Sequence, residues 1–365
     1  MVRDGAGHHS GQRTRRRRAG HRRAGQRGVL EVCDLVTGLR IGVLGASRIA
    51  EKAIVGPAQE LGHRLVAVAA RDPQRAAAFA DKHGVERVLG SYAEVIDDAE
   101  VDVVYNPLAN ALHAPWNLAA VTAGKPVLSE KPFARNRSEA ATVARAAEAA
   151  GVTVLEGFHY FFHPVTQRAF ALAAGGEIGR LTRVEVRMAM PAPDDDDPRW
   201  SLELAGGALM DLGCYGMHVL RSLGRLDVDG LRGAPSIVAA RAEQRSTDVD
   251  ATCDVEVSFP GGATGLTANS MVAPEYSFTI RIVGSEGEVL VHDFIRPNDD
   301  DRITVRTVAG ERVERLGTRA SYTYQLEAFA DHVQNGAALP FGLADAVTNM
   351  AYVDAAYQAA GLRTR

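Results

Sequence analysis

Hydrophobic and polar positions follow two different patterns along the chain. Between residues 39 and 157, alanine-rich helical stretches alternate with short apolar runs, which are "LRIGVLGA", "HRLVAVAAR", "VDVVYNPL", "KPVLSE" and "GVTVLEGF". Near-continuous apolar runs separated by helices are typical of parallel strands that are buried on both faces. The first pattern therefore predicts an α/β domain whose parallel sheet is covered by helices on both sides.

Helix signals in this half are local and clear. The segment "DPQRAAAFADKHG" begins with Asp72 at the N-cap position and Pro73 in the first turn, and Gly84 follows the last helical residue. An N-cap aspartate accepts a hydrogen bond from an unpaired backbone amide, and glycine tolerates the left-handed conformation that ends many helices. We expect a helix between Asp72 and Gly84.

After about residue 180 the pattern becomes an alternation of apolar and polar positions. The alternating runs are "LTRVEVRMAM", "SIVAARAEQR", "ATCDVEVSF", "ATGLTANSMV", "SFTIRIVG", "GEVLVHD" and "DRITVRTV". Turn signals such as "FPGG" and "GSEG" separate them. This second pattern predicts an α+β domain with a mostly antiparallel sheet, closed by the helical segments "YQLEAFADHVQNG" and "LADAVTNMAYVDAAYQAAG".

Composition fits a globular protein of this kind. The chain has 365 residues, of which 46% are hydrophobic and 24% charged, so it is long enough for two domains with sizeable cores. It contains neither an apolar run of transmembrane length nor an apolar segment typical of a signal peptide. The three cysteines are far apart and odd in number, which fits a reducing compartment. We therefore expect a cytoplasmic protein with no membrane partner.

The net charge of −4 conceals a basic N-terminal segment. Residues 1–30 contain nine arginines and one aspartate, so residues 1–38 are predicted to form a disordered basic tail. Three interpretations of this tail compete. The first is an arm that binds nucleic acid or a membrane surface, and the second is an organelle transit peptide. The third is a stretch that lies outside the native protein because the start codon is assigned too far upstream. The last is favoured, and no nucleic-acid partner is expected, because the acidic remainder of the chain would not help to hold a polyanion.

The turn after the first predicted strand carries a partial dinucleotide fingerprint. The pattern G-x-G-x-x-G reads here Gly45, Ala46, Ser47, Arg48, Ile49 and Ala50. Alanine suffices at the last position, which needs only close helix–strand packing, whereas Ser47 at the second position is a real departure. Its small side chain still allows the backbone to approach a pyrophosphate, to which the hydroxyl can donate. Dinucleotide binding is favoured over a merely structural turn.

The end of the second predicted strand indicates which dinucleotide is bound. An acidic residue for the ribose 2′-hydroxyl of NAD is expected about 20 residues beyond the fingerprint. Counting from Ala50 leads to Ala70, which Arg71 follows, and Arg75 lies one turn into the next helix. Guanidinium groups suit a 2′-phosphate, so NADP is favoured. NAD remains the alternative if Asp72 serves as the ribose acid instead of capping its helix.

Another strand tip carries the tripeptide Glu130-Lys131-Pro132. Ligands of open α/β sheets bind beyond the carboxyl ends of the strands. An ammonium group at such a place can polarise a carbonyl or hold a substrate hydroxyl beside a nicotinamide. The competing interpretation is a solvated Glu–Lys pair at a turn.

Together with the fingerprint, four segments carry a family resemblance: "EKP", "YNPLANALHAPW", "EGFHYFFHP" and "GGALMDLGCYGMH". They resemble the glucose–fructose oxidoreductase and inositol dehydrogenase family of NAD(P)-dependent oxidoreductases, above all its branch with glucose–fructose oxidoreductase, dimeric dihydrodiol dehydrogenases and aldose dehydrogenases. The resemblance covers residues 39–362. It implies a Rossmann dinucleotide-binding domain at 39–157 and an open-faced sheet domain at 158–365 through which a homo-oligomer forms.

The resemblance also implies roles for single residues. Lys131 would be catalytic and Glu130 would contact the nicotinamide ribose. Pro107, Asn110 and His113 would line the nicotinamide pocket.

The proton-transfer group is expected to be Tyr215. It stands four residues after Asp211, where the inositol dehydrogenase branch has histidine, and the resembling branch uses a tyrosine as acid/base. Because an ordinary tyrosine pKa near 10 is too high for neutral pH, we expect the Lys131 ammonium to lower it. The competing interpretation is a core tyrosine with a bonded hydroxyl. Asp211 and His218, on the same predicted helical face, and His159 are candidate substrate contacts.

A metal site is not expected. His159 and His163 are four residues apart, but no third ligand has a suitable spacing and hydride transfer requires no metal. The sequence thus predicts an NADP(H)-dependent oxidoreductase that acts on a carbinol carbon of an aldose, cyclic polyol or dihydrodiol. The alternatives are an enzyme whose bound NAD(P) recycles within one turnover, in sugar–sugar oxidoreduction or redox-assisted glycoside cleavage, and a non-catalytic nicotinamide-sensing regulator.

Overall fold

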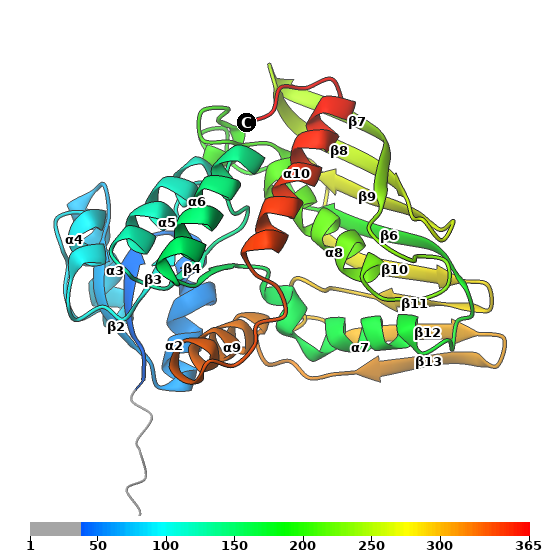
Figure 1. The fold of residues 1–365 in the computed structure, drawn as a ribbon, viewed down its shortest axis with the longest axis horizontal. Helices are drawn as coiled ribbons and strands as arrows, with labels where there is room; N and C mark the ends of the chain where they lie inside the picture. Colours follow the sequence, from blue (N-terminus) through cyan, green and yellow to red (C-terminus); the bar gives the residue numbers. More distant parts are fainter. Residues whose placement is uncertain (1–37) are drawn as a thin grey trace, which may run out of the picture. The chain divides into compact units, whose positions relative to one another are not determined.

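The structure, a computed structural model, describes residues 38–365 (Figure 1). The predicted basic tail lies almost entirely in residues 1–37, outside the described residues. The described residues form one parallel and one mostly antiparallel sheet, which confirms the predicted fold class. No helix within 38–365 is both long and apolar enough to cross a membrane.

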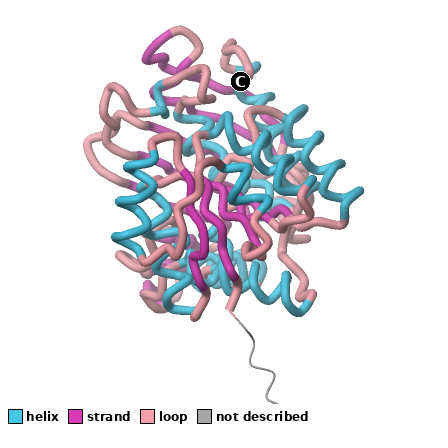
Figure 2. Tube along the Cα trace, turned by 90° about the vertical axis from the view of Figure 1, so that its left-hand side faces the viewer, coloured by secondary structure: helices cyan, strands magenta, loops and turns pink. Residues whose placement is uncertain are grey.

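The first sheet has five parallel strands in the order β2-β1-β3-β4-β5. Figure 2 shows helices on both sides of these strands, and β3, β4 and β5 are buried along their whole length. Because the strand order reverses beside β1, the carboxyl ends of β1 and β3 border the crevice in which such sheets bind ligands. The strands are β1 (Arg40–Leu44), β2 (Arg64–Ala69), β3 (Val103–Asn106), β4 (Val127–Ser129) and β5 (Val154–Glu156).

Helix ends in this half follow the predicted caps. The Asp72 carboxylate accepts a hydrogen bond from the Gln74 amide at 2.8 Å, and Gly84 ends the helix in the left-handed conformation. The helices are α1 (Arg48–Ala50), the π-helical turn η1 (Glu51–Val55), α2 (Gly56–Leu61), α3 (Pro73–His83), α4 (Tyr92–Asp97), η2 (Asn110–Leu112), α5 (His113–Thr122) and α6 (Arg137–Ala150).

The second sheet has eight strands in the order β13-β12-β11-β10-β6-β9-β8-β7, and only β6 and β9 pair in parallel. Helices α7, α8 and α10 cover one face (Figure 1). The strands are β6 (Leu181–Ala189), β7 (Ser236–Ser246), β8 (Val249–Ser258), β9 (Thr264–Ser270), β10 (Ser277–Gly284), β11 (Gly287–Val291), β12 (Arg302–Thr307) and β13 (Gly310–Arg315). The helical segments are η3 (His159–Phe162), α7 (Pro164–Ala174), η4 (Pro198–Trp200), η5 (Leu209–Gly213), α8 (Cys214–Gly224), α9 (Ser321–Asn335) and α10 (Leu343–Ala359).

The other face of this sheet carries paired charges. Arg281 on β10 contacts Glu185 on β6 and Glu288 on β11, and Glu288 also contacts Arg306 on β12. Opposite charges on neighbouring strands stabilise strand pairing modestly. The homo-oligomer expected through this sheet stays a prediction.

The last two helices return to the first half of the chain. Helix α9 packs against α2 and η1, and α10 packs against α6. The segment after the second sheet therefore contacts elements of the parallel-sheet half, and the domain boundary predicted at residues 157 and 158 stays a prediction.

Candidate active site

The fingerprint turn has the backbone that a close phosphate approach requires. Gly45 follows β1 with a φ of +94°, and its amide donates to the Ala69 carbonyl at 2.7 Å. A Cβ atom at Gly45 would lie only 2.9 Å from Cδ2 of Leu108. Ala50, at the last fingerprint position, is fully buried. Both positions are therefore restricted to the small residues that they carry.

Ser47 fits a phosphate ligand. Its hydroxyl oxygen is buried and has no hydrogen-bond partner, and its side chain does not cap α1. A buried hydroxyl without a partner is unfavourable unless a ligand or water satisfies it. The departure from glycine therefore places an available donor where a dinucleotide pyrophosphate is expected.

Beside the fingerprint lies a cavity of about 480 Å³. The predicted residues on its wall are Gly45, Ala46, Ser47, Arg71, Arg75 and Pro107. Arg75 donates to the Ala46 carbonyl at 3.0 Å, so one guanidinium is already held against the fingerprint turn. Asp72 lies at the same wall but is engaged in capping α3, as the NADP interpretation requires.

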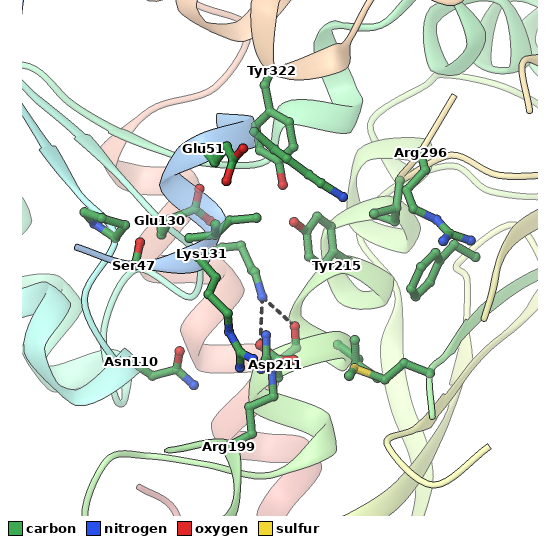
Figure 3. Close-up of a pocket in the computed structure, with 18 of the residues that line it drawn as sticks. Ser47, Glu51, Asn110, Glu130, Lys131, Arg199, Asp211, Tyr215, Arg296 and Tyr322 are labelled. Atoms are coloured by element: carbon green, nitrogen blue, oxygen red, sulfur yellow. Dashed lines mark hydrogen bonds and ion pairs between the residues drawn. The ribbon is translucent and has the colours of Figure 1, made fainter. Parts of the chain in front are cut away.

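A larger cavity, of about 800 Å³, lies between the two sheets (Figure 3). Its wall and that of the smaller cavity have six residues in common, which are Ser47, Pro107, Leu108, Ala109, Pro198 and Leu204. The predicted residues on its wall are Ser47, Arg48, Ile49, Pro107, Asn110, His113, Glu130, Lys131, Asp211 and Tyr215. The first half of the chain and the π-helical turn η5 with α8 thus bring the two predicted catalytic residues to one cavity.

Lys131 is held by an acidic residue of the second half of the chain. Its Nζ lies 2.8 Å from the backbone oxygen and 3.0 Å from Oδ1 of Asp211, and Nε of Arg199 donates to Asp211 Oδ2 at 2.8 Å. Burial opposes charge on the amine, but Asp211, Cys214 and Glu130 together outweigh it and raise the pKa of Lys131, with Asp211 the largest of the three. Likewise burial opposes the Asp211 anion, but Lys131 and Arg199 hold its pKa well below the usual range. Lys131 is therefore a cation fixed at the cavity.

Glu130, next to Lys131, is buried at the cavity wall. Tyr105 Oη donates to its Oε1 at 3.0 Å, and burial raises the pKa of the Glu130 carboxyl. A carboxyl oxygen fixed in this way can accept a hydrogen bond from a ligand hydroxyl such as that of a ribose.

The expected depression of the Tyr215 pKa is wrong. Burial raises this pKa well above its ordinary value, and neighbouring tyrosine and acidic groups add to the effect. Lys131 cannot reverse it, because its ammonium is paired with Asp211 and lies 5.2 Å from the centre of the Tyr215 ring. The Tyr215 hydroxyl instead lies 3.2 Å from Nε2 of His159.

Two predicted substrate contacts are corrected. His218 is fully buried with Nδ1 2.6 Å from the Tyr160 hydroxyl and Nε2 3.1 Å from Asp345. His159 is also fully buried and contacts Tyr215 instead of lining the cavity. Packing explains His218: its ring stacks on that of Phe158 with 4.1 Å between the centroids, and Tyr160 and Asp345 engage its two nitrogens.

His113 and Asn110 form hydrogen bonds that hold the loops around the cavity in place. The two ring nitrogens of His113 lie 2.6 Å from the Pro132 carbonyl and 2.8 Å from the Leu108 carbonyl. Asn110 Nδ2 donates to the Ala205 carbonyl at 2.9 Å, so a residue of the first half is fixed to the second. Both lie at the cavity wall, and their bonds fix the shape of the predicted nicotinamide pocket.

The far wall of the cavity consists of residues that the sequence reasoning did not identify. They include Met188, Met190, Tyr276, Phe278, Arg296 and Tyr322. The guanidinium of Arg296 lies 4.7 Å from the centre of the Tyr276 ring and 5.1 Å from that of Phe278. Tyr276 directly precedes β10 and Phe278 is its second residue, and this spacing of two residues could have indicated an aromatic face. No pattern in the sequence around Tyr322 indicated that this residue would line the cavity.

Comparisons with known proteins find matches for both halves of the chain. Residues 39–158 match the family described as "Oxidoreductase family, NAD-binding Rossmann fold", and residues 166–290 match the "GFO/IDH/MocA C-terminal domain". D-xylose 1-dehydrogenase (NADP(+)) 2 of Haloferax volcanii is 34% identical over 326 residues, which cover 88% of this chain and 97% of the relative. Trans-1,2-dihydrobenzene-1,2-diol dehydrogenase of Xenopus laevis is 30% identical over 259 residues, which cover 70% of this chain and 75% of the relative.

Solved structures share the fold. KijD10, a 3-ketoreductase from Actinomadura kijaniata in complex with NADP and TDP-benzene, superposes with a TM-score of 0.79 at 24% identity, covering 88% of this chain and 98% of that one. A levoglucosan dehydrogenase in complex with NADH and levoglucosan gives a TM-score of 0.79 at 22% identity, covering 89% and 97%. At this identity the likeness shows a common fold alone.

Proposed function

Since the chain belongs to the GFO/IDH/MocA family of oxidoreductases, we propose that it transfers hydride between NADP(H) and a carbinol carbon of an aldose, cyclic polyol or dihydrodiol. The observation that carries the proposal is the convergence of Lys131 and Tyr215 on one cavity that continues into the fingerprint crevice. The names of the relatives, a xylose dehydrogenase and a dihydrodiol dehydrogenase, support this range of substrates.

Residues on both cavities are suited to hold the dinucleotide. The Gly45 turn and the free hydroxyl of Ser47 fit the pyrophosphate. Arg71, exposed at the wall of the smaller cavity, and Arg75 beside it would take a 2′-phosphate. Glu130 would accept from the nicotinamide ribose. The bound NADP would supply the hydride acceptor or donor.

Lys131 would stabilise charge on the reacting oxygen. Its pairing with Asp211 keeps it protonated and fixes its direction, so it can donate to a substrate hydroxyl or carbonyl without prior reorganisation. Tyr215 would exchange the hydroxyl proton at the same oxygen. Polar side chains of Asn110, Arg199 and Lys131 on the wall match a substrate with several hydroxyl groups.

Cofactor choice is tested by fluorescence titration of the full chain with NADPH and with NADH. Arg71→Ala should weaken NADPH binding about 10- to 100-fold, the equivalent of one hydrogen bond to a charged group. NADH binding should stay unchanged, because NADH lacks the 2′-phosphate and thus serves as an internal control. Equal affinity of the wild type for both nucleotides would refute the NADP assignment without touching the oxidoreductase assignment.

Catalysis is tested with NADP⁺ and a panel of aldoses, inositols and dihydrodiols. Lys131→Ala should lower kcat about 10²- to 10³-fold, and Tyr215→Phe by about 10² or more. Lys52→Ala and Tyr276→Phe are matched controls, since both residues line the same cavity and neither is assigned a chemical role. Full activity of the Lys131 variant would contradict the mechanism. Nucleotide that survives purification would favour the alternative in which the bound cofactor recycles.

A further inference from the structure

A buried histidine stands directly behind the Tyr215 hydroxyl. His159, the first residue of η3, is fully buried, and its Nε2 lies 3.2 Å from the Tyr215 oxygen. Its other ring nitrogen, Nδ1, lies 2.8 Å from the Ser321 hydroxyl at the start of α9. Its ring stacks on Tyr322 with 3.8 Å between the centroids. Three elements that are distant in the sequence thus form a line from the cavity through Tyr215 to Ser321.

The contact between Tyr215 and His159 resolves a difficulty in the proposed mechanism. A tyrosinate at Tyr215 is unfavourable, because burial raises its pKa and the Lys131 ammonium is paired with Asp211. A tyrosine that must accept a proton without ionising needs a second group to take its own proton. Within the described structure, His159 is the base whose ring nitrogen lies within hydrogen-bond distance of the Tyr215 hydroxyl.

We propose that His159 is a positioning residue that also takes the phenolic proton of Tyr215 when a substrate hydroxyl is oxidised. The inference rests on the proposed function and assigns to that site a proton relay from Tyr215 to His159. Ser321 fixes the relay by accepting from Nδ1–H, which leaves the Nε2 lone pair directed at the Tyr215 hydroxyl.

The step balances in atoms and charge. Bound NADP⁺ would supply the hydride acceptor when the carbinol C–H bond breaks, while the O–H bond of the substrate would break and its proton would pass to the Tyr215 oxygen. The phenolic O–H bond of Tyr215 would break at the same time, and that proton would bond to Nε2 of His159. The substrate would become a carbonyl compound, and the positive charge lost by the cofactor would be balanced by the one gained by the imidazole. Reduction runs through the same atoms in reverse.

The surroundings of His159 fit this role. Burial, with the charges of Lys131 and His163, lowers its pKa to about 3, so the resting imidazole is neutral and its Nε2 is free to accept. The other ionisable side chains against the ring are Tyr215 and Tyr322, and both are neutral at ordinary pH because burial raises their pKa values. The imidazolium would form only as the cationic nicotinamide is neutralised, which offsets the unfavourable environment.

The test is a double-mutant cycle between His159 and Tyr215. His159→Phe keeps the aromatic stack on Tyr322 but removes both ring nitrogens, and kcat should fall about 10²-fold with KM and NADPH affinity unchanged. In the Tyr215→Phe background the same change should have no further effect, because the relay is already broken. Ser321→Ala should give a smaller fall in kcat, since this change removes only the hydrogen bond that fixes the tautomer of His159.

A second substitution separates positioning from proton transfer. His159→Gln can still accept a hydrogen bond from Tyr215 but cannot take its proton, so kcat should stay low. His292→Gln is the matched control. His292 bonds to the Thr304 hydroxyl in the second sheet and does not line the cavity, and kcat should not change. NADPH titration and thermal unfolding of every variant report whether the fold is intact.

The outcomes distinguish this inference from the proposed function. Full activity of Tyr215→Phe would refute the acid/base part of the proposed function and this inference with it. If Tyr215→Phe is impaired while His159→Phe is fully active, or if the two losses multiply in the double variant, the inference alone is overturned. Recovery of kcat in His159→Gln would overturn the proton transfer to His159.

Discussion

Replacement of Arg365 by alanine should destabilise the fold measurably, although Arg365 is far from the cavity in sequence. The Arg365 side chain is fully buried, and its Nη2 lies 2.9 Å from Oδ1 of the equally buried Asp250. Its Nε donates to the Gly206 carbonyl at 2.9 Å, and its guanidinium lies 4.1 Å from the centre of the Tyr357 ring. Asp250 in turn accepts from the amide of Leu209, the first residue of η5, at 2.6 Å.

The size of the effect follows from what Arg365→Ala leaves behind. Removing one partner of a buried ion pair costs about 3–5 kcal/mol of unfolding free energy. We expect the lower end, about 3 kcal/mol, because the Leu209 amide and the Tyr357 hydroxyl still donate to Asp250. Burial also raises the pKa of Asp250, which makes a neutral carboxyl accessible once the guanidinium is gone. With an unfolding entropy of about 2.1 cal/mol/K per residue over roughly 330 residues, the melting temperature should fall by about 4 °C.

Thermal unfolding at neutral pH, followed by circular dichroism, measures this shift. Arg365→Ala, Asp250→Asn and the double variant form a cycle in which the double variant should be less destabilised than the two single losses together. Arg363→Ala, at an exposed position two residues earlier, should melt within about 1 °C of the wild type, as is usual for surface substitutions. An Arg365→Ala protein that melts like this control would refute the reasoning.

Three further outcomes are expected. Gly45→Ala should weaken NADPH binding about 10- to 100-fold in a fluorescence titration, because a left-handed backbone and the approach to Leu108 strain any Cβ there, and unchanged affinity would contradict this. Asp345→Asn should destabilise the protein most at neutral pH. Although burial opposes the anion, paired cations hold the pKa of Asp345 below its usual range. Its stabilisation therefore begins to fall below the unfolded-state pKa of about 4 and is lost only as the pH falls through the lower folded-state pKa, and urea unfolding at several pH values should show the difference shrink in that direction. Asp211→Asn should move the alkaline limb of kcat/KM to lower pH, because this carboxylate raises the pKa of Lys131, and an unmoved limb would exclude Lys131 as the titrating group.

Much of the fold was predictable because its signals are local. Apolar runs of strand length with helices between them predicted the parallel sheet, and the alternating runs predicted the antiparallel one. The Asp72 cap and the Gly84 end depend on hydrogen bonds within a few residues, and the structure has both. Gly45 and Ala50 were identified for the same reason, since the backbone of a tight turn and the packing of one helix on its own strand are properties of a short segment.

Partners and ionisation states were decided only by the tertiary structure. The sequence predicted Lys131 and Tyr215 as a coupled catalytic pair. In the structure the ammonium of Lys131 is instead paired with Asp211, a residue 80 positions away. Because a pKa depends on burial and on every charge nearby, regardless of sequence distance, the direction of the Tyr215 shift was predicted wrongly. His218 is held in the core by its stacking on Phe158 and its contact with Asp345, and both partners are distant from it in the sequence. The line from Tyr215 to His159 and Ser321 exists only because η3, α8 and α9 meet, and no local pattern encodes a meeting of three distant segments.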